Sequence, residues 1–182
     1  FAQARFHYRK ASHLNPEESK LFYKIACTYF HEQQWGSAVK QLEVALRIQR
    51  LKPEYNLLMG ECKMQLNETK DAVQFLSTAV RVRPKNVSGW EALIRCLYAA
   101  KFFSEAKQQA IAALSYTKNK PVFLFYLSAI LFGMNKSKEA GLYLEKALTT
   151  SPKQLKKFIQ LNPALLQNAQ VVDIIARFKK SR

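Results

Sequence analysis

Glycine and proline are scarce in this sequence, with five and six residues among 182. So few glycines argue against a glycine-rich phosphate-binding loop and against a turn-rich β-sandwich or barrel. No apolar run reaches the roughly 18 residues that span a bilayer, so we expect no membrane association. The sequence opens on Phe1 without a signal peptide, and we expect it to be a fragment of a longer chain.

Side chains suited to catalysis or metal binding are also few. The only aspartates are Asp71 and Asp173, and the sequence has no nucleophile elbow, no H-E-x-x-H motif and no C-x-x-C pair. Cys27 and His31 lie four residues apart, as in a Cys/His dyad, but we interpret them as a chance pair on a helix surface. The cysteines share no metal-ligand spacing with the histidines, which are His7, His13 and His31. We therefore predict a protein without catalytic activity, metal or cofactor.

What the sequence does contain is a packed-domain composition and an internal repeat. Apolar residues make up 48% and charged residues 23%, which excludes a disordered tail. Alanines recur every 34 residues in two series, seven residues apart: Ala4, Ala38, Ala72, Ala106 and Ala140, then Ala11, Ala45, Ala79, Ala113 and Ala147. Residues seven apart lie on one face of a helix. The small side chain lets two helices approach closely, so the pattern predicts stacked helix pairs.

The details of the repeat resemble the tetratricopeptide repeat (TPR) family. The first repeat carries Trp35, Ala38, Leu42 and Ala45, and the second carries Met59, Gly60, Ala72, Leu76, Ala79 and Pro84. The resemblance covers roughly residues 2–154 and implies an all-α fold, an α-solenoid wound as a right-handed superhelix. One departure is that Asn56 and Lys63 replace aromatic residues, so we expect the first helix of the second repeat to pack less well.

The repeat predicts the organisation of the whole chain. Residues 1–18 are expected to hold the second half of a truncated repeat, and residues 155–182 a helical cap with a basic tail. Between them we expect four repeats, at 19–52, 53–86, 87–120 and 121–154. Their first helices are predicted at 19–32, 53–66, 87–100 and 121–134, and their second helices at 35–48, 69–82, 103–116 and 137–150. The alternative for the C-terminal stretch is a dimerisation or docking helix.

In the family, the first helix of each repeat lines the concave surface. The resemblance therefore implies a partner-binding groove, lined here by Tyr23, Cys27, Phe30, Leu57, Glu61, Met64, Glu91, Arg95, Tyr98, Phe125 and Phe132. Glu54 falls in the same set of helix positions. Exposed apolar patches usually mark a partner surface, and rigid aromatic side chains make good anchors. We expect the groove to bind an apolar peptide or helix, the alternative being that the cap or a tight superhelix covers these rings.

Some family members bind the acidic C-terminal tail of chaperones through lysine, asparagine and arginine side chains. The corresponding positions in this sequence carry Tyr23, Cys27, Leu58, Ser88 and Ala92. None of these side chains pairs with a carboxylate, so we do not expect that partner.

The formal net charge is +16, and basic residues cluster at the ends of the second helices. The expected basic edge consists of Arg47, Arg50, Lys52, Arg81, Arg83, Lys85, Lys118 and Lys120. Such an edge suits a polyanion or nucleic acid, but cations also favour helix C-termini through the helix dipole. Stacking aromatics are expected in the groove rather than on this edge, so nucleic-acid binding is the alternative function.

The cysteines are expected to be free thiols. Cys62 and Cys96 are 34 residues apart and so occupy equivalent positions in neighbouring repeats, beyond the roughly 7 Å between Cα atoms that a disulfide spans. Cys27 lies one position away and is expected to face the groove. Reduced cysteines predict a reducing compartment and hence a cytoplasmic location.

We therefore predict a non-catalytic scaffold or adaptor that binds a protein partner. A third possibility is a self-association module, forming a homodimer through exposed terminal helices.

Overall fold

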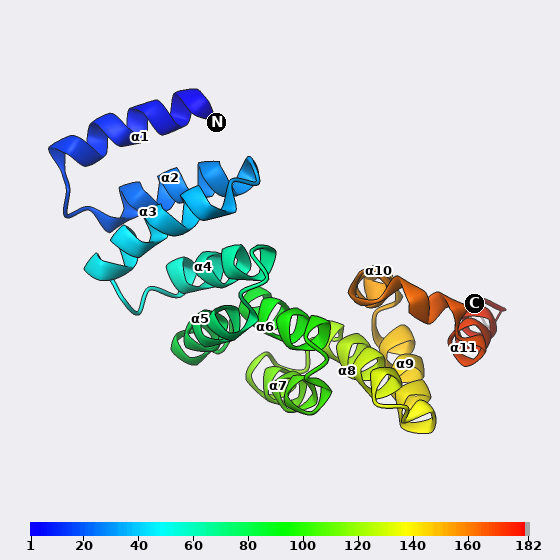
Figure 1. Ribbon diagram of the computed structural model, residues 1–182. Helices are drawn as coiled ribbons and strands as arrows, with labels where there is room; N and C mark the ends of the chain where they lie inside the picture. Colours follow the sequence, from blue (N-terminus) through cyan, green and yellow to red (C-terminus); the bar gives the residue numbers. More distant parts are fainter. Residues whose placement is uncertain (181–182) are drawn as a thin grey trace. The chain divides into compact units, whose positions relative to one another are not determined.

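The computed structural model describes residues 1–180, and within that range the chain is helical throughout, without a strand (Figure 1). The α-helices are α1 (Ala2–Leu14), α2 (Ser19–His31), α3 (Trp35–Ile48), α4 (Pro53–Gln65), α5 (Thr69–Val82), α6 (Val87–Ala99), α7 (Phe103–Tyr116), α8 (Val122–Gly133), α9 (Ser137–Thr150), α10 (Leu155–Leu161) and α11 (Ala169–Lys180). Two short 3-10 helices, η1 (Pro152–Gln154) and η2 (Pro163–Gln167), flank α10. None of the helices described is long and apolar enough to cross a membrane. Ser181 and Arg182, the end of the predicted basic tail, lie outside the described residues.

The chain forms two compact units, Phe1–Ala92 and Leu93–Arg182, which we call unit 1 and unit 2. In unit 1, each helix from α1 to α4 packs against the next helix in sequence. In unit 2, α8 packs against both α7 and α9, and α11 packs against α9. The prediction of an all-α fold built from consecutive helix pairs is confirmed.

The repeated alanines from Ala38 to Ala147 lie in the core. Ala38, Ala45, Ala72, Ala106 and their equivalents up to Ala147 are buried. A methyl group at these positions allows close packing that a larger side chain would prevent. Ala4 and Ala11 differ, since α1, which packs against α2, has no buried residue.

The turn inside each helix pair has the same backbone conformation in every pair. Gln33, Asn67, Lys101 and Asn135 have φ angles of 58°, 61°, 61° and 59° and follow one another at the repeat interval. Asparagine tolerates this left-handed region better than most residues, which suits Asn67 and Asn135. The second helices begin and end at the predicted residues, whereas the first helices end one residue earlier because the turn begins there.

Asn56 does not weaken the second pair, contrary to the expectation from the missing aromatic. Its buried side chain donates hydrogen bonds of 2.9 Å to the carbonyls of Arg50 and Lys52. One repeat later, Trp90 donates from its indole N–H to the carbonyl of Pro84 at 2.7 Å. Both side chains reach back six residues and donate a hydrogen bond to a carbonyl in the turn between pairs.

Lys63, the other departure from the aromatic pattern, pairs with a carboxylate of the next turn. Its ammonium group lies 2.5 Å from Glu68 and 3.8 Å from Asp71. Hydrogen bonding to Glu68 raises the pKa of Lys63 above its ordinary value, so the side chain stays charged. An ion pair therefore stands where the family has an aromatic contact.

The helices of the predicted C-terminal cap belong to unit 2 and pack on α8 and α9. Helix α10 packs on α8 through Phe158, which is fully buried. Helix α11 packs on α9 through Val171 and Ile174, and the Gln170 side chain donates to the carbonyl of Ser137 at 3.1 Å. As a result every residue of α8 from Val122 to Phe132 is buried, because the helix is covered by α7, α9 and α10.

We predict that Gly60→Ala destabilises the protein, whereas Gly36→Ala does not. A Cβ at Gly60 would lie 2.5 Å from the Leu76 Cγ, whereas a Cβ at Gly36 would meet nothing within 4 Å. Overpacking of this kind costs about 1–3 kcal/mol, while alanine at an open helical position gains up to about 1 kcal/mol. Urea denaturation of the two variants measures the difference. Equal stability of both variants would contradict the close approach of α4 and α5.

Candidate functional site

The first helices of unit 1 present a half-buried strip of mainly apolar side chains. Tyr23, Cys27 and Phe30 follow one face of α2, and Leu57, Glu61 and Met64 follow the corresponding face of α4. The spacing of four and three residues places each trio on one helix face. We call these six residues the inner strip. The strip rests on the core of unit 1, since Tyr23, Cys27 and Phe30 pack against the cluster of buried residues that α3 and α4 contribute to.

Aromatic contacts fix both ends of the strip on α2. The Tyr23 ring stacks on Tyr55 with centroids 4.8 Å apart, and the Tyr55 hydroxyl shares a 3.1 Å hydrogen bond with Ser19. At the other end, Phe30 meets Trp35 edge to face at 5.0 Å. These contacts restrict the rotamers of Tyr23 and Phe30, so the strip is preorganised.

A hollow of about 510 Å³ adjoins the Tyr23 end of the strip. Its charged lining residues are Glu17, Glu18, Lys20, Lys24, Lys52 and Glu54. Glu54 is the most unusual of them: its Oε1 accepts from Arg83 at 2.5 Å, while its Oε2 is buried and has no hydrogen-bond partner among the described residues. Burial, with a contribution from Cys27, raises the pKa of Tyr23 above its ordinary value, so its hydroxyl stays protonated and can donate.

In unit 2 the aromatic residues expected in the groove are covered. Phe125 is 0% exposed, and its ring lies 6.3 Å from the ring of Phe158 on α10. Tyr98 is 9% exposed and accepts a 3.0 Å hydrogen bond from the Asn162 side chain at the end of α10, and Phe132 is 8% exposed. The expectation that these three rings line an open surface is wrong, since all three are buried and the C-terminal cap contacts Phe125 and Tyr98.

The two remaining polar groove residues lie on α6, one in each unit. Glu91 is half-buried in unit 1, and Arg95 is exposed in unit 2. Only the inner strip is therefore left as a partly exposed apolar surface among the residues assigned to the groove.

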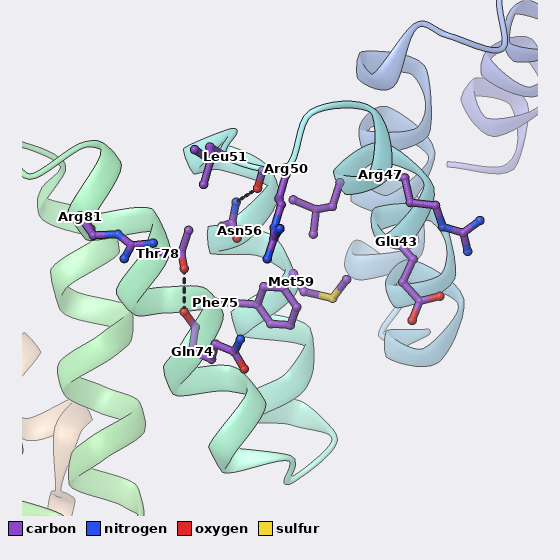
Figure 2. A pocket seen from close by; sticks show the side chains of 11 residues that line it. Glu43, Arg47, Arg50, Leu51, Asn56, Met59, Gln74, Phe75, Thr78 and Arg81 are labelled. Atoms are coloured by element: carbon purple, nitrogen blue, oxygen red, sulfur yellow. Dashed lines mark hydrogen bonds between the residues drawn. The ribbon is translucent and has the colours of Figure 1, made fainter.

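The residues assigned to the basic edge take several different places. Arg47, Arg50 and Arg81 line a separate pocket of about 920 Å³ between α3 and α5 (Figure 2). Lys52 lines the hollow at Tyr23, and Arg83 pairs with Glu54. The other three, Lys85, Lys118 and Lys120, are exposed.

Sequence reasoning missed the apolar floor of the pocket between α3 and α5. Leu46, Met59 and Phe75 form it, from three different helices. The repeat could have indicated it, since Leu46 directly follows an alanine of the second series and so belongs to the apolar side of its helix.

Cys27 and His31 do not form a dyad. Burial raises the pKa of Cys27, while His31 stacks on Phe1 with ring centroids 5.2 Å apart. Burial raises the pKa of Cys62 to about 12 and also raises that of Cys96. Within residues 1–180, no three His, Cys, Asp or Glu side chains are grouped so that they could hold a metal ion.

Comparison with known proteins matches one repeat directly. Residues 53–86, the bounds predicted for the second repeat, match the family model of the tetratricopeptide repeat. Over 81 residues the chain is 31% identical to anaphase-promoting complex subunit 3 of Dictyostelium discoideum. That match covers 44% of this chain and only 8% of the length of the subunit.

Solved structures with a similar fold include MamA, YrrB and TTC0263. MamA has a TM-score of 0.74 at 17% identity, with 84% of this chain and 83% of that chain covered. YrrB, described as a TPR protein with an unusual peptide-binding site, has a TM-score of 0.66 at 19% identity, with 94% and 81% covered. TTC0263, a thermophilic TPR protein of Thermus thermophilus, has a TM-score of 0.65 at 18% identity, with 89% of each chain covered. At these identities the likeness concerns the fold.

We predict that the stability of the protein falls as the pH rises above about 9, and that Cys62 contributes to the fall. The ordinary pKa of the thiol is 9.0, and burial raises it to about 12 in the folded chain. The folded state therefore keeps a proton that the unfolded state loses, and the free energy of unfolding falls by up to about 1.4 kcal/mol per pH unit for this group. Cys62→Ala should flatten this part of the profile between pH 9.0 and about 12, as measured by urea denaturation. An unchanged slope would contradict the assignment.

We also predict that Phe158→Ala removes the cover over α8. Loss of a fully buried ring costs about 3–5 kcal/mol, so the variant should unfold at a lower urea concentration. Leu166→Ala is the control, because this side chain of η2 is exposed and should change stability by less than about 0.5 kcal/mol. Far-ultraviolet circular dichroism follows the loss of helix. If both variants behave alike, α10 does not cover α8.

Proposed function

We propose that this chain, in which residues 53–86 match the tetratricopeptide repeat, is a non-catalytic scaffold that binds a protein partner through the inner strip of unit 1. Proteins of this fold generally mediate protein–protein interactions. The observation that carries the proposal is that Tyr23, Phe30, Leu57 and Met64 remain partly exposed on a preorganised surface. Contiguous apolar surface of this kind is typical of a partner site.

The chemistry of the strip suits an apolar peptide segment with a polar end. Leu57, Phe30 and Met64 offer contacts to apolar side chains, and burial of such side chains contributes about 25 cal/mol per Å². At the Tyr23 end, the exposed carboxylates of Glu17 and Glu18 line the hollow and can accept hydrogen bonds from a backbone N–H or an amine of the peptide.

We also infer that the chain is divided into the four repeats predicted from sequence, 19–52, 53–86, 87–120 and 121–154. The recurrence of the left-handed turn at Gln33, Asn67, Lys101 and Asn135 supports this division. One half-repeat would precede them at 1–18, and the helices after residue 154 would be the cap.

Self-association is the second candidate function, and helix α1 favours it. Phe1, Phe6 and Leu14 are 64%, 54% and 81% exposed, and α1 has no buried residue of its own. A second copy that packs on α1 would bury these side chains.

Leu57→Glu in the full chain is expected to abolish capture of the partner. A carboxylate at the centre of the strip would have to be desolvated on binding, which should weaken the complex at least about tenfold. The measurement is affinity capture from the native source, followed by calorimetric titration with the captured protein. A matched control is Leu142→Glu, since Leu142 is exposed on α9 and lies outside the strip.

Three further measurements distinguish partner binding through the inner strip from self-association. Both variants should keep the melting temperature of the unmodified chain. Light scattering of the unmodified protein shows whether it forms a dimer without any partner. If Leu57→Glu captures the same protein with the same affinity, the inner strip does not bind it.

A further inference from the structure

The pocket between α3 and α5 has walls and a floor of different chemistry. Leu46, Met59 and Phe75 form an apolar floor, and Met59 is only 2% exposed. Arg47 and Arg50 come from the α3 side and Arg81 from α5, with Glu43 as the sole acidic lining residue (Figure 2). The pocket of about 920 Å³ is thus an apolar depression with an excess of positive charge at its rim.

Four ion pairs of unit 1 lie outside the pocket: they join Arg5 to Glu32, Lys63 to Glu68 and Asp71, and Arg83 to Glu54. Guanidinium groups bind carboxylates in a bidentate manner, and they lose hydration more readily than ammonium groups. Arginines beside an apolar floor therefore favour a ligand that brings its own carboxylates.

The position of Arg50 is fixed by the chain around it. Asn56, itself a buried residue that lines the pocket, donates to the Arg50 carbonyl at 2.9 Å and holds the turn after α3. Figure 2 shows the Arg50 side chain reaching from this turn over the pocket toward Phe75. One repeat later the position of Arg50 is taken by Pro84, so the next turn between pairs has no arginine to offer at this place.

A second hollow extends the pocket along α5. It has a volume of about 330 Å³ and shares Gln74, Thr78 and Arg81 with the pocket. Arg81 therefore borders both spaces. The combined surface is longer than one side chain requires, and it suits several consecutive residues of a peptide.

We propose that this pocket binds an acidic peptide segment of a partner protein, with one bulky apolar side chain on the floor and flanking carboxylates on Arg47, Arg50 and Arg81. The pocket lies on the side of the second helices and shares no residue with the inner strip, so the two proposals stand independently. A single-stranded nucleic acid fits less well. Such ligands stack on successive aromatic rings, and Phe75 is the one ring that lines the pocket.

Fluorescence anisotropy with a synthetic peptide panel tests the proposal. The probe peptides have a central phenylalanine between pairs of glutamates, with varied outer residues. Two matched panels replace the phenylalanine by serine or the glutamates by lysines. We expect micromolar binding for the first panel and at least about tenfold weaker binding for the other two, because both the apolar and the charged contacts are required.

Variants of the full chain locate the binding. Arg50→Glu and Arg81→Glu should each weaken the best peptide at least about tenfold, because they reverse a charge at the rim. Lys70→Glu is the matched control: it makes the same change of charge type on α5, on an exposed residue that does not line the pocket. It should change binding by less than about twofold. The inner-strip variant Leu57→Glu should bind the peptide normally.

Three results would overturn the proposal. The first is the absence of saturable binding up to about 1 mM, which corresponds to only about 4 kcal/mol. The second is equal weakening by Lys70→Glu and Arg50→Glu, which would indicate attraction to the net charge alone. The third is tighter binding of an oligouridylate of the same charge, which would assign the arginines to nucleic acid.

Discussion

The close approach of neighbouring helices is the constraint on which the rest of the structure depends. Two helices can pack closely only where the side chains between them are small. The buried alanines from Ala38 to Ala147 supply such side chains at the repeat interval. Gly60 meets the same need within the second pair. Once the helices of a pair are packed in this way, the side of each helix that faces outward is determined. This places the inner strip and the pocket between α3 and α5 on unit 1.

Equivalent faces of the first helices are buried in unit 2 and partly exposed in unit 1, because different residues follow them in the chain. In unit 2, α10 places Phe158 against Phe125 and Asn162 against Tyr98, so the apolar face of α8 is closed. In unit 1, Tyr23 and Phe30 are held by Tyr55 and Trp35 but stay partly exposed. An apolar first-helix face is thus either covered, as on α8, or left partly exposed, as on α2 and α4, and its own sequence does not distinguish the two.

This difference explains what could be predicted. The bounds of the second helices follow from the repeat interval, since each helix is specified by its own alanines and its own turn. The burial of Phe125 could not be read from α8, because it depends on Phe158, more than a full helix away along the chain. Only the charged part of the pocket between α3 and α5 could be predicted from the sequence, through the basic residues Arg47, Arg50 and Arg81. Its floor could not, because Leu46, Met59 and Phe75 come from three different helices. Likewise, Asn56 departs from the family pattern, yet its role follows from the Arg50 and Lys52 carbonyls it satisfies.

One turn of the chain connects the two proposed surfaces. In the segment after α3, Gln49 and Lys52 line the hollow at Tyr23, whereas Arg50 and Leu51 line the pocket between α3 and α5. The Asn56 side chain donates hydrogen bonds to the carbonyls of Arg50, which lines the pocket, and Lys52, which lines the hollow. A ligand that moved this turn from one side would move residues that line the space on the other side. By thermodynamic linkage, any such coupling is equal in both directions. If the partner bound at the inner strip raises the affinity of the pocket for the acidic peptide, the peptide raises the affinity of the strip for that partner by the same factor. A ligand that leaves the turn in place produces no coupling, because equal affinity for two conformations shifts neither.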